Sequence, residues 1–459
     1  STITSNSSNH GVPSGIAEVP FELLQHYPNF ERLKETDLMN KKLMAVAVAG
    51  AIGAPGLAFA QAANVNIYGT IDARYDSMKF SSNATNTISG LTKAHFQGQA
   101  PRWGIRGTED LGGGLQAYWQ VESGLSIDGR QDLSSSTGGV NTFGGRDSYI
   151  GLRGSWGSIQ GGGFGTAFKA IQGVWNANPT LNHGGIIMGN GDTTGAAPSP
   201  NCQGTTGTNG GQSQNICAPT AEANGTAFSR REANYMQYET PNISGFVGRI
   251  GTIASEWAEP STTTPAGQAQ SKPKLWSYAV TWSGGPFTAG FGYETHEGFR
   301  ATNLAATNRM AKDKAWTVGG KWNFGQGEVG VGYESMKYGN AATDAASNAF
   351  DQKFWVVNGN WKVTSAGMIN AGYSKTPGRT NCGASLTDAL GTCGNAQGAK
   401  HVHLAYDHAM SKRTSLYAMY AKLTNNNNGV SGATYYYIAG PTGNGTNGTG
   451  TGPNGIAAG

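Results

Sequence analysis

The sequence predicts an all-β fold, a transmembrane antiparallel up-and-down β-barrel with 16 strands expected. From Val65 onward, segments of about ten residues alternate apolar with polar side chains, as strands between lipid and water do. Short links alternate strictly with long connections rich in glycine and asparagine. An outer-membrane barrel has short turns on one rim and long loops on the other, whereas a soluble sandwich has no reason to sort its loops by length. The short links are 110–114, 153–158, 240–245, 283–286, 323–327, 363–367 and 409–413.

The composition excludes a helical membrane protein. Only 37% of the residues are hydrophobic, and no apolar run reaches the ~18–20 residues that a spanning helix needs. A barrel accepts this composition because each strand gives only alternate side chains to lipid. With roughly 25 residues for a strand and its connections, the stretch from Gln61 onward supplies about sixteen strands.

The N-terminal region has the pattern of a secretory signal. Residues 39–60 read MNKKLMAVAVAGAIGAPGLAFA, with a lysine pair, an apolar core and a small-x-small cleavage site. A buried core helix is the alternative, but the flanks match a signal peptide on both sides. We therefore expect 39–60 to be a signal peptide, 61–459 to be the barrel, and 1–38 to be an extension without assigned role that the mature protein lacks.

Charge and cysteines limit the partners. Residues 61–459 carry 28 basic and 23 acidic side chains, a formal net charge of +5. No basic runs occur, so we expect no nucleic-acid partner, and we expect no cofactor. Cysteines fall in two local pairs, each inside one expected external loop, and no C-x-x-C motif suggests a metal. In an oxidising compartment, disulfides Cys202–Cys217 and Cys382–Cys393 are expected.

Alternation also assigns faces to the strands. Ile67, Ile71 and Tyr75 share the lipid face of the first strand. In the second strand, Arg102 and Arg106 lie opposite Trp103 and Ile105. An arginine near the middle of the lipid face costs roughly 2–4 kcal/mol, so the arginines are expected to face water. Strands are expected at 65–76, 100–109, 115–125, 146–151, 158–165, 231–238, 246–254, 274–282, 287–295, 313–322, 328–337, 352–362, 367–375, 400–408 and 414–423.

Aromatic residues near the strand ends favour interfacial girdles. They are Trp276, Trp282, Phe287, Trp316, Trp322, Phe354, Trp361, Tyr406 and Tyr417. After Leu423 the chain becomes a Gly/Asn-rich tract, 424–459, without a convincing closing strand. Since an open edge in hydrocarbon leaves backbone groups unpaired, about fifteen strands suggest a missing last strand and a truncated C-terminus. The first and fifteenth strands would then be adjacent across a gap or only loosely paired.

Four segments carry a resemblance to a known family. RWGIRGTEDLGGGLQAYWQVESGL (102–125), GRDSYIGLRGSWGSIQGGGFGT (145–166), RREANYMQYETPNISGF (230–246) and SKRTSLYAMYAKLTNN (411–426) resemble the general porins of Gram-negative bacteria, in particular the betaproteobacterial trimeric type. The resemblance implies an outer-membrane homotrimer of sixteen-stranded barrels. It also implies that the third long loop, here 166–225, folds inward and narrows the pore.

The resemblance further implies an arginine cluster on the barrel wall opposite that loop. Arg102, Arg146 and Arg231 match its motif positions, and alternation alone also gives Arg102 and Arg231 a wet face. On the loop, Lys169 and Asp192 are the tentative constriction residues. The chain departs from the family in having only Asp192 and Glu222 as acids there, and in ending on Gly459 rather than an aromatic residue.

These observations predict a channel for passive diffusion of small hydrophilic solutes and inorganic ions, with a mild preference for anions. Two alternatives remain open, an adhesin or receptor anchored by its barrel and an outer-membrane hydrolase. No nucleophile, metalloprotease or phosphate-loop motif supports an enzyme. His401, His403 and Asp407 share one strand face, but a polar lumen face explains them more simply than a metal site, which would need further ligands.

Overall fold

The computed structural model describes residues 64–80, 92–97, 101–125, 143–177, 228, 231–254, 274–297, 312–338, 350–378, 380–381, 399–425 and 453–458. By its internal contacts the chain divides into 1–61 and 62–459, and all described residues belong to the second unit. The expected extension 1–38, the expected signal peptide 39–60 and the four cysteines lie outside the described residues. Among the described residues, no helix is long and apolar enough to cross a membrane.

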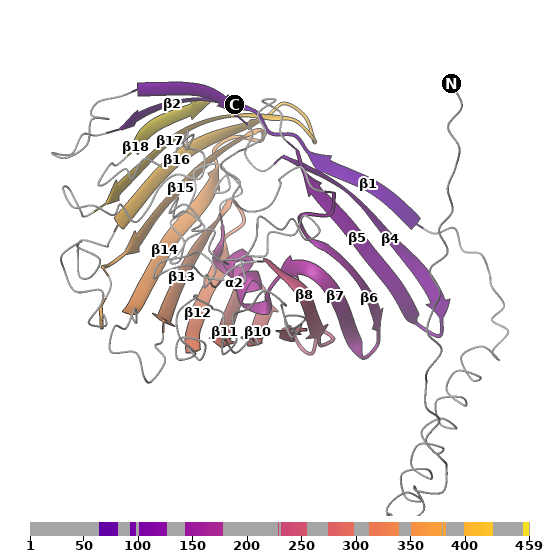
Figure 1. The fold of residues 1–459 in the computed structure, drawn as a ribbon. Coiled ribbons are helices and arrows are strands. Elements are labelled where there is room, and N and C mark those ends of the chain that lie inside the picture. The colour runs from indigo at the N-terminus through magenta and orange to yellow at the C-terminus, as the bar shows by residue number, and fades with distance from the viewer. Residues whose placement is uncertain are drawn as a thin grey trace, which may run out of the picture. The chain divides into compact units, whose positions relative to one another are not determined.

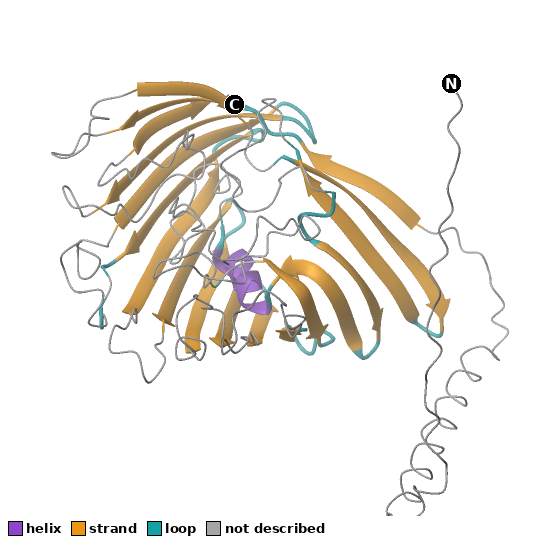
Figure 2. Cartoon of the chain, in the orientation of Figure 1, coloured by secondary structure: helices purple, strands orange, loops and turns teal. Residues whose placement is uncertain are grey.

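The second unit is one antiparallel sheet that curls around a single described helix (Figures 1 and 2). Its strands are β1 (Asn64–Thr70), β2 (Arg74–Phe80), β3 (Thr92–Gln97), β4 (Arg102–Gly112), β5 (Leu115–Gly124), β6 (Ser148–Gly154), β7 (Gly157–Gly165), β8 (Arg231–Glu239), β9 (Phe246–Ile253), β10 (Lys274–Gly284), β11 (Phe287–Glu297), β12 (Lys312–Asn323), β13 (Gly327–Tyr338), β14 (Phe350–Lys362), β15 (Gly367–Thr376), β16 (Ala399–Ala409), β17 (Ser415–Asn425) and β18 (Pro453–Ala458). The helix, α2, spans Ala167–Trp175.

The predicted up-and-down connectivity is confirmed. From β4 to β18, each described strand pairs antiparallel with the next along the chain. At the ends, β1 pairs with β4, while β2 pairs with β18 and β3. The hydrogen-bonded order therefore runs from β1 through β4 to β18 and then to β2 and β3, and the described strands do not close into a ring.

Three strand assignments differ from expectation. The single strand expected at 65–76 is interrupted at 71–73 and forms β1 and β2. Strand β3, with its short polar sequence, was not expected at all. The tract after Leu423 was expected to contain no strand, but Pro453–Ala458 forms β18, whose backbone pairs with β17 and β2. β18 therefore stands where the gap was expected, because backbone pairing does not require an alternating side-chain pattern, while the described sheet stays open between β1 and β3.

Burial is reversed relative to a water-soluble sheet. On β12, alternate residues are buried polar or small side chains and exposed apolar or long ones. The buried set is Asp313, Ala315 and Thr317, whereas Trp316 and Val318 are exposed. On β1 and the residue after it, Ile67 and Ile71 are 75% and 77% exposed. Apolar side chains outside and polar ones inside are the arrangement of a barrel that lipid surrounds and water fills.

Exposed aromatic rings gather at the short-turn ends of several strands. Phe246 contacts Trp282, Phe287 stacks on Trp322, and Phe324 lies between Trp322 and Trp361. This band agrees with the expected girdle, since amphipathic rings favour the membrane interface. Two of the aromatics expected there point inward instead. Phe354 is buried beside Trp175, and the buried Tyr417 donates a hydrogen bond to Asp72.

Candidate functional site

A short helix lies on the inner face of the sheet, directly after β7 (Figure 1). Thr166 begins the helix as N-cap, and its hydroxyl accepts a hydrogen bond from the Lys169 N–H at 3.3 Å. The apolar side of α2 is fully buried, with Phe168, Ile171 and Trp175 each no more than 1% exposed. These side chains form a core with small and apolar residues of β10 to β14. This is where the first part of the expected inward loop, 166–225, is described.

Glycines on the wall provide the space in which α2 sits. An added Cβ would lie 2.5 Å from the Trp175 ring at Gly319 and 1.9 Å from the Trp175 carbonyl oxygen at Gly330. At Gly332 it would lie 2.8 Å from the same ring. Such distances require the helix to move, because packed interiors have no spare volume. The glycine-rich strands β12 and β13 therefore allow the helix to approach their backbone.

Buried polar side chains attach both ends of α2 to the wall. At the start, the Ala167 and Phe168 N–H groups donate to Tyr235 Oη at 3.1 Å and Ser277 Oγ at 2.8 Å. At the end, Asn358 accepts from the Ala177 N–H at 2.6 Å and donates to the Trp175 carbonyl at 3.2 Å. These bonds satisfy helix-terminal groups that would otherwise be buried without partners. The helix is thus held at both ends.

Arg102 and Arg146 converge on one buried carboxylate. Arg146 Nε lies 2.6 Å from Glu122 Oε1, and Arg102 Nε lies 3.7 Å from Glu122 Oε2. Tyr68 also donates its hydroxyl proton to Glu122 Oε2 at 3.0 Å. Arg146 precedes β6, and burial lowers the pKa of its guanidinium, with the charges of Arg231 and Arg102 lowering it further. The three predicted arginines are therefore close enough to influence one another.

Arg231 pairs with a second carboxylate. Its Nε and Nη2 donate to the two oxygens of Asp147 at 2.8 and 3.0 Å, a bidentate geometry that fixes both groups. Burial acts to raise the pKa of Asp147, but Arg231, Arg146 and the Gly165 N–H outweigh it and hold this pKa below its ordinary value. Asp147 lies outside the strands and is charged at neutral pH.

A bulge breaks the alternation along β8, although Arg231, the first residue of that strand, still reaches Asp147 beside the inner pocket. Simple alternation grouped Arg231 with Tyr235 and Gln237, but the register shifts where Gly162 and Phe164 pair with β8, and Asn234 has a positive φ of 53°. As a result Glu232, not Arg231, is buried on the side of Tyr235 and Gln237. That grouping was wrong because one extra residue reverses the alternation beyond it.

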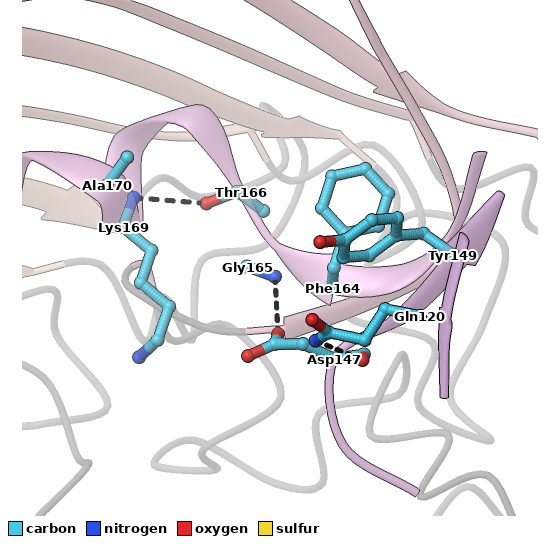
Figure 3. A pocket seen from close by; sticks show the side chains of 8 residues that line it. All are labelled: Gln120, Asp147, Tyr149, Phe164, Gly165, Thr166, Lys169 and Ala170. Carbon is cyan, nitrogen blue, oxygen red and sulfur yellow. Dashed lines mark hydrogen bonds between the residues drawn. The ribbon is translucent and has the colours of Figure 1, made fainter. Parts of the chain in front are cut away.

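Lys169 lies beside this cluster, on the first turn of α2. It lines a pocket of about 300 Å³ together with Gln120, Asp147, Tyr149, Phe164, Gly165, Thr166 and Ala170. Figure 3 shows the Lys169 side chain and the Asp147 carboxylate extending on the same side of Gly165. The other tentative loop residue, Asp192, lies outside the described residues.

Sequence reasoning named Arg102, Arg146 and Arg231 but missed Glu122 and Asp147, the carboxylates they pair with in the structure. Glu122 and Asp147 lie within the quoted segments 102–125 and 145–166, yet no spacing rule links Glu122 to Arg146 across 24 residues. The acids were sought on the inward loop, whereas the structure places them on β5 and just before β6. The available signal was a carboxylate on the water-facing side of a strand whose neighbour carries an arginine on the same side.

The three residues that alternation puts on one strand face, His401, His403 and Asp407, all lie on β16 (Ala399–Ala409). His401 and His403 are buried with rings 5.7 Å apart, and Asp407 accepts a hydrogen bond from Asn370 on β15. Among the residues that the structure describes, no group of three or more His, Cys, Asp or Glu side chains is arranged to hold a metal ion.

Comparison with known proteins identifies the family. The family model described as Gram-negative porin matches residues 45–428. This chain belongs to the Gram-negative porin family, and its place is the outer membrane of a Gram-negative bacterium.

Relatives and solved structures agree with this assignment. The chain is 26% identical to the major outer membrane protein P.IB of Neisseria gonorrhoeae over 215 residues, which are 46% of this chain and 47% of that protein. It is 33% identical to a P.IB protein of Neisseria meningitidis serogroup B over 132 residues, 28% of this chain and 35% of that protein. The match spans about half the length, or less, of these curated relatives.

The fold is similar to that of an anion-selective porin from Comamonas acidovorans, with a TM-score of 0.59 at 20% identity over 86% of this chain and 98% of that one. It is also similar to the outer membrane channel DcaP of Acinetobacter baumannii, with a TM-score of 0.50 at 11% identity over 86% and 96%. At these identities the structural likeness shows the fold alone.

Proposed function

We propose that this protein is a water-filled channel for passive diffusion of small hydrophilic solutes and ions, with a mild preference for anions. The observation that carries the proposal is α2, attached to the polar inner face of a sheet whose outer face is apolar. A helix in that place narrows the passage without filling it, and pore selectivity comes from such a constriction and its charges. We further propose that the protein works as a homotrimer, as the family resemblance implies.

The proposed anion preference is supported by the charges on the wall. Arg102, Arg146 and Arg231 share two carboxylates, Glu122 and Asp147, so three positive charges meet two negative ones. A residual positive charge beside a narrow passage raises the local concentration of anions, and salt screens this effect. The similarity in fold to an anion-selective porin agrees with this sign.

Planar-bilayer recordings of the purified full-length protein test the proposal. We expect discrete conductance steps, and a reversal potential in a KCl gradient whose sign favours chloride. Glu122→Gln removes one wall carboxylate and is expected to move the reversal potential further toward anions. An absence of conductance would refute the channel and favour an adhesin anchored by its barrel, and a cation-preferring wild type would refute the anion preference.

A further inference from the structure

The arginines on the inner wall fall into two electrostatic groups. Among the described residues, four of them form ion pairs with carboxylates at 3.7 Å or less. Those pairs are Arg102 and Arg146 with Glu122, Arg231 with Asp147, and Arg249 with Glu239. Two others, Arg106 and Arg153, lie instead over tyrosine rings, at 5.0 Å from Tyr68 and 5.3 Å from Tyr118.

The two kinds of contact have different effects on a passing ion. A one-to-one ion pair, such as Arg231 with Asp147 or Arg249 with Glu239, has little net charge, so its field falls off quickly with distance. Arg102 and Arg146 share Glu122 and keep about one net positive charge between them. A tyrosine ring has a quadrupole and no net charge, so it holds a guanidinium in place while leaving the full positive charge. Arg106 is exposed on its strand, while the paired arginines range from 19% exposed for Arg146 to 35% for Arg102 and 36% for Arg231. Arg106 therefore keeps its full positive charge on one exposed side chain, whereas Arg102 and Arg146 share about one net positive charge and Arg231 and Arg249 are each neutralised by a carboxylate.

The neighbours of Arg106 explain how it is positioned. The Tyr68 ring lies over Gly104, where an added Cβ would come within 2.6 Å of it, so only glycine allows the ring to lie flat on the wall. The Tyr68 hydroxyl is fixed by its hydrogen bond to Glu122. Tyr68 is therefore a rigid surface under Arg106, and its orientation is set by the same carboxylate that binds Arg102 and Arg146.

The register places Arg106 at the level of the constriction. Arg106 is opposite Gln120 on β5, and Gln120 is opposite Tyr149 on β6. Gln120 and Tyr149 line the pocket beside α2, together with Lys169. Arg153 belongs to a different level, because it stands next to the tight turn between β6 and β7 at the rim.

We propose that Arg106 is a principal selectivity residue of this channel, and that the paired arginines mainly shape and stiffen the wall. The ligands it attracts are small inorganic and organic anions in transit. This inference rests on the proposed channel function, but it concerns which residue sets the charge preference and not whether the channel conducts.

Reversal potentials of single variants test the inference. A charge about 6 Å from a permeating ion, in a water-like medium with salt, changes the anion-to-cation permeability ratio about threefold. We expect Arg106→Gln to lower the ratio by about that factor and Arg106→Lys, which keeps the charge, to retain most of it. Arg153→Gln is the matched control, since it removes the other tyrosine-stacked arginine beside the short turn between β6 and β7, and it is expected to change the ratio little.

The comparison between variants decides the inference, whatever ion the wild type prefers. Circular dichroism and the wild-type number of conductance steps would establish that Arg106→Gln is folded. The inference is overturned if folded Arg106→Gln keeps the wild-type ratio, or if Arg106→Lys loses as much preference as Arg106→Gln. A wild type that prefers cations would refute the proposed anion preference. Arg106→Gln would still be expected to lower the anion-to-cation permeability ratio below that of the wild type, so the inference would still be tested.

Discussion

Asn358 is the residue whose removal tests the role of α2 most directly. Asn358 is 2% exposed and makes two hydrogen bonds to the end of the helix, one with the Ala177 N–H and one with the Trp175 carbonyl. Each such bond contributes about 0.5–1.5 kcal/mol net, so Asn358→Ala removes about 2 kcal/mol from the docking of α2. Since 1.4 kcal/mol is a factor of ten, the undocked population rises roughly thirtyfold.

Single-channel recording is the assay for Asn358→Ala. If α2 narrows the passage as proposed, its release appears as transitions to a higher conductance level. We expect the time spent at that level to increase by more than tenfold. Asn370→Ala is the control, because Asn370 bonds to Asp407 on the next strand, away from α2. Unchanged conductance in Asn358→Ala, or an equal effect in Asn370→Ala, would refute the idea that α2 defines the constriction.

Three further predictions concern stability. Gly330→Ala places a Cβ 1.9 Å from the Trp175 carbonyl oxygen, so overpacking is expected to cost about 1–3 kcal/mol and lower the thermal midpoint in detergent. The control is Gly173→Ala, on the exposed side of α2, where an added Cβ has nothing within 4 Å; this change is expected to leave the midpoint unchanged or raise it. Because the folded pKa of Asp147 is lowered, the stability that its charge contributes is present above the ordinary carboxyl pKa of about 4 and is lost as pH falls through the folded value. The difference in thermal midpoint between wild type and Asp147→Asn is therefore expected to be constant from pH 8 to about 5 and to vanish in stronger acid. A difference that vanishes near neutral pH would contradict the pairing of Asp147 with Arg231. Peptide mapping by mass spectrometry is expected to find Cys202–Cys217 and Cys382–Cys393, each closing a loop that stabilises by roughly 3 kcal/mol; four free thiols or a link between the two loops would show this pairing to be wrong.

Most strands were predictable because alternation is a local property. Trp316 and Val318 are separated by one residue and therefore share a face in any regular strand, whatever the strand pairs with. The same rule put Ile67 and Ile71 toward lipid, and the structure agrees. Where the regular geometry breaks, the rule fails, as the bulge at Asn234 shows for Arg231.

Strand β18 shows a different limit. Its sequence, PNGIAA, contains proline, asparagine and glycine, which single-sequence reasoning assigns to loops. It becomes a strand because β17 and β2 each offer backbone hydrogen bonds to it. Unpaired backbone groups of neighbouring strands are not visible in the segment itself.

Much of the architecture follows from local sequence: an antiparallel sheet with an apolar outer face, arginines near a long connection, and short links between strands. Which charges neutralise one another, and how far the inward segment approaches the wall, depend on contacts between distant strands. Glu122 lies 24 residues from Arg146, and Trp175 lies over 140 residues before Gly319. Such contacts arise when curvature and register bring distant strands together, so they depend on the whole sheet, whereas the face of a side chain depends mainly on its nearest neighbours in the chain.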